Sequence, residues 1–448
     1  MLTPEIRKYQ ERYGCDRRWK LVGAPPPGLD TVVVIPALAE SDHLFKTLKS
    51  VACNDEASTA RTLVVCVINN GGPGRVPVES LRDNENTLRT LERVIGKKTT
   101  ASDGPDACAV ASSSLNVAYI NASSPGLELP AKGGVGLARK IGMDRGIELF
   151  DDTGESLKLL FCLDADTLVD PDWISMTRRN IEERRLVAAA VEFAHRGGET
   201  RDDDDAIRLY ETVIRYYRLG LEYARSPYAY HAIGSTIAVS AEGYLAVRGM
   251  PRREAGEDFH FLNKLAKTGR VGIVSETRVY PSARRSRRVP FGTGQALCRS
   301  WAHGNTIHRT WDPRVFRILG AWNELLAGKA SSSEAVTLIE KARAVNPLLV
   351  EFLRHEGFEM VWPRLLKNSG SRGVSTKHAV EWFDALKTYK MIRFLTLHAY
   401  PPIPVYSALA RLWEMKGRKF PFDFPNGGSP PARDIRRAVL EMLRTEKG

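Results

Sequence analysis

The stretch Leu159-Leu160-Phe161-Cys162-Leu163-Asp164-Ala165-Asp166 decides the fold class of this chain. Its run of apolar residues is typical of a strand that is buried on both faces, as in a parallel sheet. Two carboxylates follow where this strand ends, and in open α/β sheets ligands bind at that edge. Because Mg²⁺ and Mn²⁺ prefer oxygen ligands, Asp164 and Asp166 are candidates for holding a cation and a charged substrate. The alternative is that they only open the following turn, where aspartate is common.

On both sides of this stretch, apolar segments rich in β-branched residues alternate with segments of helical periodicity. Further buried strands are predicted at residues 31–36, 63–68, 115–120 and 186–193. This alternation indicates an α/β fold with a parallel sheet. From about residue 312 the alternation stops and helix follows helix. We therefore expect an N-terminal lead-in at residues 1–30, an α/β domain at 31–310 and a mostly α-helical region at 311–448.

The length of 448 residues is typical of an enzyme, and the composition is that of a soluble globular protein. No apolar run approaches the roughly 18 residues that a membrane span requires. The N-terminus has no apolar signal core, so a cytoplasmic protein is expected. The six cysteines lack the spacing of a metal site, which predicts reduced cysteines packed in the interior.

The net charge of +12 suits partners that carry negative charge, such as nucleic acid, anionic lipid or a phosphorylated substrate. Residues 277–310 contain seven arginines and no acidic residue. Such a segment is either a solvated basic loop or a phosphate-binding one. The acidic run at residues 202–205 is expected in a solvated loop that holds no metal.

A glycine-rich segment, residues 132–143, precedes the central strand and contains Arg139. Glycines allow backbone N–H groups to approach a phosphate, and an arginine adds a bidentate contact. The same residues also fit an ordinary loop before a helix. Their spacing matches neither a Walker A loop nor a complete dinucleotide-binding motif.

A second pair of carboxylates, Glu257 and Asp258, follows Gly256. Apolar residues at 259, 262, 265 and 266 predict a helix here, which places Asp258 at its start. Aspartate is a favoured N-cap and stabilises a helix by about 1 kcal/mol in that role. Two adjacent carboxylates carry more negative charge than a cap requires, which favours a functional role.

Four segments in this order resemble the family 2 glycosyltransferases, which have the GT-A fold. They are Val33-Val34-Ile35-Pro36, Gly136-Leu137-Ala138-Arg139, Leu163-Asp164-Ala165-Asp166 and Gly256-Glu257-Asp258. The resemblance covers roughly residues 30–305. It implies a Rossmann-like mixed sheet flanked by helices. It also implies an enzyme of the hexosyltransferase class that uses a nucleotide-diphospho-sugar donor.

The resemblance assigns the donor to the loop after the first strand and to the end of the second. The residues implied are Pro36, Ala37, Glu40, Asn69 and Asn70. Many relatives carry Asp-Asp-Gly where this chain has Asn69-Asn70-Gly71. An amide still hydrogen-bonds a base, but this difference leaves the base of the donor open.

The resemblance also implies a divalent cation, Mn²⁺ or Mg²⁺, which stabilises the nucleoside diphosphate that leaves as the sugar is transferred. Asp166 would bind this metal directly, and Asp164 would hold both ribose and metal. Arg139 would support the pyrophosphate. His303 lies where some relatives supply a further metal or pyrophosphate ligand, although a lone histidine in such a segment is more often structural. In the resembled fold the segment after the Glu-Asp pair often closes over the donor, so arginines within 277–310 are expected to reach its pyrophosphate.

The family pattern gives Asp258 the role of accepting the proton of the attacking hydroxyl, with Glu257 orienting it or the acceptor. A single displacement of this kind inverts the anomeric centre. Processive polysaccharide synthases carry Gln-x-x-Arg-Trp, whereas here Gln295, Arg299 and Trp301 are spaced differently. This difference, and the lack of an expected membrane span, argue against a processive synthase.

The acceptor class stays open among a glycan, a lipid-linked glycan and a small metabolite. The basic surface is compatible with peripheral contact with the inner face of an anionic membrane, whereas nucleic acid is not an expected partner. A sugar nucleotidyltransferase is an alternative, although its usual signature of Gly, Arg and Lys after the first strand is missing here. A basic protein that binds nucleic acid or a membrane surface is another alternative, but it would not explain the two carboxylate pairs.

Overall fold

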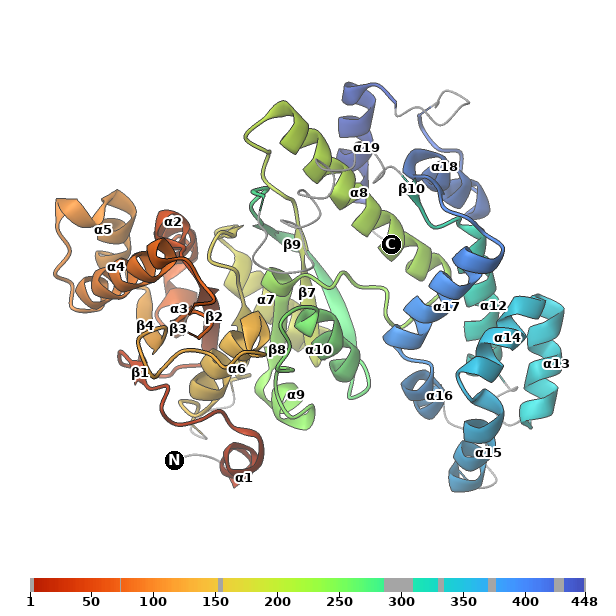
Figure 1. The fold of residues 1–448 in the computed structure, drawn as a ribbon, viewed down its shortest axis with the longest axis horizontal. Coiled ribbons are helices and arrows are strands. Elements are labelled where there is room, and N and C mark those ends of the chain that lie inside the picture. Colours follow the sequence, from red (N-terminus) through yellow and green to blue (C-terminus); the bar gives the residue numbers. More distant parts are fainter. Residues whose placement is uncertain are drawn as a thin grey trace. The chain divides into compact units, whose positions relative to one another are not determined.

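The computed structural model describes residues 4–72, 74–151, 156–285, 309–328, 334–369, 376–422 and 431–446. The chain divides into two compact units. Unit 1 comprises Met1–Gly198 and Ala232–Gln295, and unit 2 comprises Glu199–His231 and Ala296–Gly448. Unit 1 contains a large sheet with its helices, whereas unit 2 is mostly helical (Figure 1).

A mixed sheet forms the core of unit 1, with nine strands among the described residues in the order β1-β4-β3-β2-β5-β8-β7-β9-β6. Strands β4, β3, β2 and β5 are parallel neighbours, whereas β8 is antiparallel to both β5 and β7. This confirms the predicted α/β fold with a mixed sheet. The strands are β1 (Leu21–Val22), β2 (Thr31–Ala37), β3 (Thr62–Asn69), β4 (Asn116–Ala122), β5 (Leu159–Cys162), β6 (Leu168–Val169), β7 (Ala188–Phe193), β8 (Ile237–Ser240) and β9 (Val271–Tyr280).

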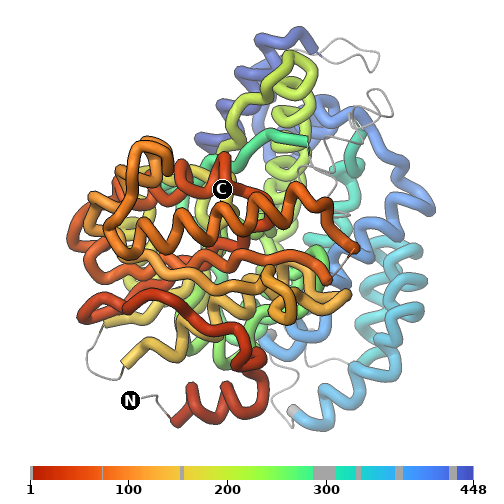
Figure 2. The backbone as a smooth tube through the Cα atoms, turned by 60° about the vertical axis from the view of Figure 1, so that its left-hand side comes forward, coloured from red at the N-terminus to blue at the C-terminus, as the bar shows by residue number. Residues whose placement is uncertain are grey.

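The helices of unit 1 pack on this sheet, whose strands run side by side in Figure 2. Every residue of β2 and β3 is buried, as expected for β-branched strands covered on both faces. Helix α6 lies directly on them, with Gly142 against Val34 and Val67. The helices are α1 (Pro4–Tyr13), α2 (Ser41–Ala52), α3 (Glu56–Thr59), α4 (Val78–Ile95), α5 (Pro105–Ala111), α6 (Gly134–Ile147), α7 (Trp173–Glu183), α9 (Ala241–Ala246) and α10 (Glu257–Leu265).

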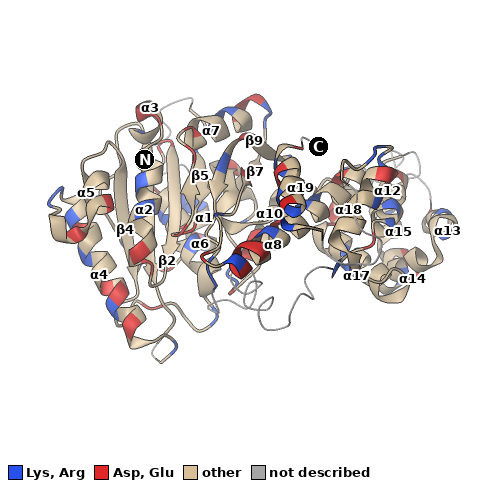
Figure 3. Ribbon diagram, turned by 90° about the horizontal axis from the view of Figure 1, so that it is seen from above, with Lys and Arg blue, Asp and Glu red and all other residues tan. Residues whose placement is uncertain are grey.

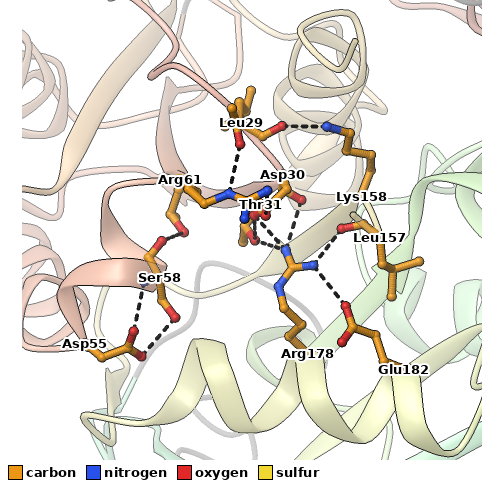
Figure 4. Close-up of polar contacts among 12 residues, drawn as sticks. Leu29, Asp30, Thr31, Asp55, Ser58, Arg61, Leu157, Lys158, Arg178 and Glu182 are labelled. Carbon is orange, nitrogen blue, oxygen red and sulfur yellow. Dashed lines mark hydrogen bonds and ion pairs between the residues drawn. The ribbon is translucent and has the colours of Figure 1, made fainter. Parts of the chain in front are cut away.

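The parallel strands are fixed at their N-terminal ends by a cluster of charged groups around Asp30 (Figure 4). Arg178 Nη2, from α7, donates to Asp30 Oδ1 and to Thr31 Oγ1 at 2.7 Å each. Arg61 Nη2, just before β3, lies 2.8 Å from Asp30 Oδ2. These contacts tie β2, β3 and α7 together, and they leave the C-terminal ends of the strands available for a site.

The N-terminal lead-in is anchored on α6 through the buried carboxylate of Asp144. Asp144 Oδ1 accepts hydrogen bonds of 2.7 Å from Tyr9 Oη and from Tyr244 Oη, and its Oδ2 accepts one of 2.9 Å from the Cys15 N–H. Lys140 Nζ lies 3.0 Å from Asp144 Oδ2, and both side chains are almost fully buried. The lead-in therefore supports the helix that also carries Arg139.

Unit 2 is a helical bundle around a core of aromatic and aliphatic side chains, including Phe316, Trp322 and Phe358. A two-stranded sheet pairs β10 (Arg309–Thr310) with β11 (Ile403–Pro404). The helices are α8 (Arg201–Tyr223), α12 (Arg314–Ala327), α13 (Ala335–Val345), α14 (Pro347–His355), α15 (Phe358–Ser369), α16 (Thr376–Trp382), α17 (Ala385–His398), α18 (Val405–Met415) and α19 (Arg433–Thr445).

The acidic run at residues 202–205 lies at the start of α8, so the predicted solvated loop was wrong (Figure 3). Negative charge near a helix N-terminus is stabilised by the helix dipole. The α19 residue Arg433 contacts Asp204 at 2.9 Å and Asp205 at 2.8 Å, which explains why these carboxylates are not fully solvated.

Among the described residues, no helix combines the length and apolar character that crossing a membrane requires. The cysteines Cys15, Cys66 and Cys162 are buried and free, as predicted. Cys53 is free but exposed, so the prediction of interior packing was wrong for this residue.

The Asp144 contacts make a prediction about stability. Replacing Asp144 by alanine leaves Lys140 buried without its carboxylate, a change that costs roughly 3–5 kcal/mol when one partner of a buried pair is removed. The free energy of unfolding, measured by urea denaturation, should fall by that amount. Asp16→Ala, at a side chain that is 60% exposed, is the control and should change it by less than about 0.5 kcal/mol. Equal effects of the two substitutions would contradict the anchoring role of Asp144.

Candidate active site

The Arg139 guanidinium joins the two predicted carboxylate motifs. Its Nη2 donates to Asp164 Oδ1, and its Nη1 donates to Glu257 Oε1. Arg139 is 4% exposed and Glu257 is 3% exposed, whereas the Asp164 side chain is 37% exposed. Arg139 comes from α6, Asp164 from the end of β5 and Glu257 from the first residue of α10. The structure therefore brings together three residues that lie far apart in the sequence.

Arg139 is held in place by close packing against Gly234. A Cβ atom at position 234 would overlap the Nη2 atom of Arg139, so no other residue fits there without moving the guanidinium. Gly234 could not be predicted from the sequence as part of the site. A single glycine before β8 does not indicate that an arginine from another element packs against it.

The glycine-rich start of α6 serves packing in this structure, which corresponds to the second of the two interpretations of residues 132–143. The Gly136 N–H donates to the carbonyl oxygen of Arg253 at 3.2 Å. A Cβ on Gly136 would lie 2.5 Å from that same oxygen, and one on Gly134 would collide with Glu254. Because residues 253 and 254 cover these glycines, the glycine backbone does not form an open phosphate cradle.

Asp258 lies beside this group, at the second residue of α10. The N-cap of α10 is Gly256, so the alternative role of Asp258 as the N-cap is wrong. Asp258 Oδ1 accepts a hydrogen bond of 2.7 Å from the Phe259 N–H. Burial raises the pKa of the Asp258 carboxyl above its ordinary value of 3.8, and the nearby Asp164 carboxylate adds to this, although Arg139 acts in the opposite direction. A partly exposed carboxylate with a raised pKa is suited to accepting a proton.

Asp166 belongs to a second cluster, centred on Arg284. Arg284 Nε donates to Asp166 Oδ2 at 2.8 Å, and its Nη2 contacts Glu40 Oε1. The loop around Asp166 is fixed by backbone contacts: Thr47 Oγ1 donates to the Ala165 carbonyl, and Arg196 Nη2 donates to the Asp166 carbonyl, at 2.8 Å each. Arg284 belongs to the arginine-rich segment, but no pattern distinguished it there from its neighbours.

The ends of β2 and β3 lie together, as the resemblance implies for a donor site. Pro36 and Ala37 pair in register with Val67 and Ile68. Asn84, which the sequence analysis missed, bridges the two segments. Its side chain accepts from the Ala39 N–H at 2.9 Å and donates to the Asn69 carbonyl at 3.2 Å.

Asn69 and Asn70 are buried at the C-terminal end of β3. Among the described residues, neither side-chain oxygen accepts a hydrogen bond. Buried acceptors without a partner are rare in folded proteins. Both oxygens are shielded from solvent, so a ligand would reach them only after neighbouring groups move. A role of these residues in donor binding stays a prediction.

The last predicted ligand, His303, lies outside the described residues. Burial and the nearby Arg284 lower the pKa of His43 below 6.5, so this histidine is mostly neutral at pH 7 and adds little charge to the Asp166 cluster.

The described residues fit a divalent cation that takes its remaining ligands from water and phosphate. Among them, no three or more His, Cys, Asp and Glu side chains gather into a metal site of their own. Asp164 and Asp166 each use one carboxylate oxygen for an arginine, and the other oxygen accepts no hydrogen bond from a described residue. Mg²⁺ often takes only one or two carboxylates, with water and phosphate as the remaining ligands.

Charged groups of both signs meet at this site. Among the described residues, the carboxyl groups of Glu40, Asp164, Asp166, Glu257 and Asp258 lie with the guanidinium groups of Arg139, Arg196 and Arg284. The carboxylates can hold a cation, and the guanidinium groups can hold an anion. The residues present therefore fit a divalent ion that arrives with an anionic ligand.

Comparisons with known proteins give only distant matches. The sequence matches no protein family model, and no curated protein is similar to it in sequence. Among solved structures, the chain is similar to a fragment of S. aureus TarS in complex with UDP-GlcNAc, with a TM-score of 0.38 and 12% identity over 89% of this chain and 95% of that one. It is also similar to the mannosyltransferase PcManGT from Pyrobaculum calidifontis in complex with GDP-Man and Mn²⁺, with a TM-score of 0.36 and 14% identity over 88% of this chain and 92% of that one. Both matches are too distant to assign a function to this chain.

The Arg139 contacts predict a loss of stability when the guanidinium is removed. In Arg139→Met, the buried Glu257 and the nearby Asp164 lose their counter-ion, which costs roughly 3–5 kcal/mol.

The Tm of Arg139→Met should therefore lie well below that of the wild type. Arg75→Met, at an exposed arginine, is the control and should show little change. A loss for Arg139→Met that is no larger than that of Arg75→Met would contradict the role of the ion pairs.

Proposed function

We propose that this protein is a metal-dependent, inverting glycosyltransferase of family 2. It would transfer a sugar from a nucleotide-diphospho-sugar donor to a hydroxyl of a glycan, a lipid-linked glycan or a small metabolite. The observation that carries this proposal is the Arg139 bridge between Asp164 and Glu257. The partly exposed Asp164 carboxylate, which would hold the donor, thereby lies near the Glu257–Asp258 pair, which would serve the acceptor.

The donor end of the proposed site is supported by the polar groups at the ends of β2 and β3. Asn69 and Asn70 would lie near the base of the donor, and Asn84 holds the loop after Pro36 and Ala37 beside Asn69. From there the diphosphate of the donor would extend to Asp164 and Asp166.

A divalent Mn²⁺ or Mg²⁺ ion, when bound by Asp166 and Asp164, supplies positive charge for the leaving diphosphate. Glu40 and Arg284 lie beside the same loop, and Glu40 would act on the donor through Arg284. Arg139 acts as a positioning residue, because its buried guanidinium fixes both Asp164 and Glu257.

In the proposed reaction, Asp258 accepts the proton of the attacking hydroxyl as its oxygen bonds to the anomeric carbon. The bond from that carbon to the phosphate oxygen breaks, and its electron pair stays on the departing nucleoside diphosphate. The raised pKa of Asp258 makes it a stronger base than an ordinary carboxylate. Attack from the side opposite the leaving group inverts the anomeric centre.

Donor binding is testable with a panel of nucleoside diphosphates in the presence of Mn²⁺ or Mg²⁺. A diphosphate at 100 times its Kd should stabilise the protein by about 2.7 kcal/mol, seen as a rise in Tm. Asp166→Asn should lose the metal-dependent part of this shift. Asp42→Asn, at an exposed acid on α2, is the matched control and should retain it. If no diphosphate and metal pair shifts the Tm of the wild type, the proposed function is wrong.

The role of Asp258 is testable by hydrolysis of the identified donor, with water in place of the unknown acceptor. Asp258→Asn should reduce kcat by about 10²–10⁴-fold while the diphosphate affinity stays unchanged. Glu254→Gln, at an exposed acid outside the Glu257–Asp258 pair, is the control and should keep the rate of hydrolysis unchanged.

Because Asp258 must be ionised to act as a base, the wild-type rate should fall as the pH drops through its raised pKa. The acidic limb of the pH profile should therefore lie above 3.8. A limb at or below that value, or full activity of Asp258→Asn, would exclude Asp258 as the base.

A further inference from the structure

Arg284 contacts the carboxylate that the proposed function assigns to the metal. Its Nε donates to Asp166 Oδ2 at 2.8 Å, while Nη2 of the same guanidinium contacts Glu40 Oε1. One planar guanidinium thus bridges two carboxylates from different segments, the loop after β2 and the loop after β5. Contacts of this geometry are among the stronger ion pairs in proteins.

The position of Arg284 is set by the structure around it. The segment that carries it follows β9, which pairs with β7 and β6. The Arg196 N–H donates to the Pro281 carbonyl at 3.0 Å, while the Arg196 side chain donates to the Asp166 carbonyl at 2.8 Å. Arg196 therefore ties the Arg284 segment to the same loop that carries Asp166.

Arg284 and a divalent ion would compete for the same group. The Arg284 side chain is 25% exposed and that of Asp166 is 19% exposed, so the ion pair is largely shielded from water. An ion that binds the other oxygen, Asp166 Oδ1, lies beside the positive charge of this guanidinium, and an ion that binds both oxygens must displace it. When a diphosphate is present, its oxygens can bind the guanidinium in place of Asp166, because an arginine fork binds phosphate as it binds carboxylate.

We propose that Arg284 is a built-in competitor of the divalent cation at Asp166, so that the metal enters together with an anionic diphosphate and binds poorly alone. This inference rests on the proposed function only in taking Asp166 as the metal ligand. It predicts that metal and diphosphate each raise the affinity for the other by the same factor, as linkage requires.

The direct test is the affinity of the full-length protein for Mn²⁺ alone, measured by the loss of the free-ion signal in electron paramagnetic resonance. The wild type should bind Mn²⁺ weakly without nucleotide. Arg284→Gln should bind it at least about tenfold more tightly, because the competing charge is gone. Arg285→Gln removes the same charge from the exposed neighbouring side chain and should leave the Mn²⁺ affinity unchanged.

Arg284→Lys covers the case in which Arg284→Gln does not fold. A lysine keeps the charge but lacks the planar fork, so the Mn²⁺ affinity should lie between those of the wild type and Arg284→Gln. An Mn²⁺ affinity that neither substitution changes would overturn the inference, as would an equal gain in Arg285→Gln.

The outcome also separates this inference from the proposed function. If Arg284→Gln gains Mn²⁺ affinity while no nucleoside diphosphate binds either protein, the competition stands and the glycosyltransferase proposal fails. If diphosphates bind with metal but the substitutions leave the affinity for Mn²⁺ alone unchanged, the proposed function stands and the competition fails.

Discussion

The arrangement of the site depends on one buried guanidinium, that of Arg139. It compensates Asp164 on one side and Glu257 on the other, and without it two loops would present unpaired carboxylates to each other. The surrounding structure fixes Arg139 from several directions. Helix α6 packs on β2 and β3 through small residues, Gly234 leaves room for the guanidinium, and the N-terminal lead-in anchors the same helix through Asp144.

The balance of charges around Arg139 and Arg284 gives the site its proposed chemistry. Carboxyl and guanidinium groups meet there, in a chain whose net charge is +12. Carboxylates favour a cation, and a diphosphate is favoured where a cation or a guanidinium neutralises its charge. Arg284 provides one such guanidinium, which connects the proposed metal site to a residue of the arginine-rich segment.

Much of the sheet was predictable because its strands carry a local signal. The runs of Val and Ile in β2 and β3 are buried on both faces, and Asp164 and Asp166 follow β5 as expected. The contacts of the site were not predictable from local patterns. Arg284 meets Asp166 across 118 residues of sequence, and neither side chain indicates its partner. Likewise, the glycines at the start of α6 fit both phosphate binding and close packing until the chain at Arg253 is placed against them.

The proposed chemistry requires that Asp164 and Asp166 bind a metal together with a nucleoside diphosphate. The most direct measurement is a crystal structure with Mn²⁺ and the diphosphate that binds best, in which anomalous scattering locates the metal. A manganese peak is expected at coordination distance from the Asp166 carboxylate and from the diphosphate, with the Arg284 guanidinium moved off Asp166. A diphosphate bound elsewhere, or a metal away from Asp164 and Asp166, would contradict it.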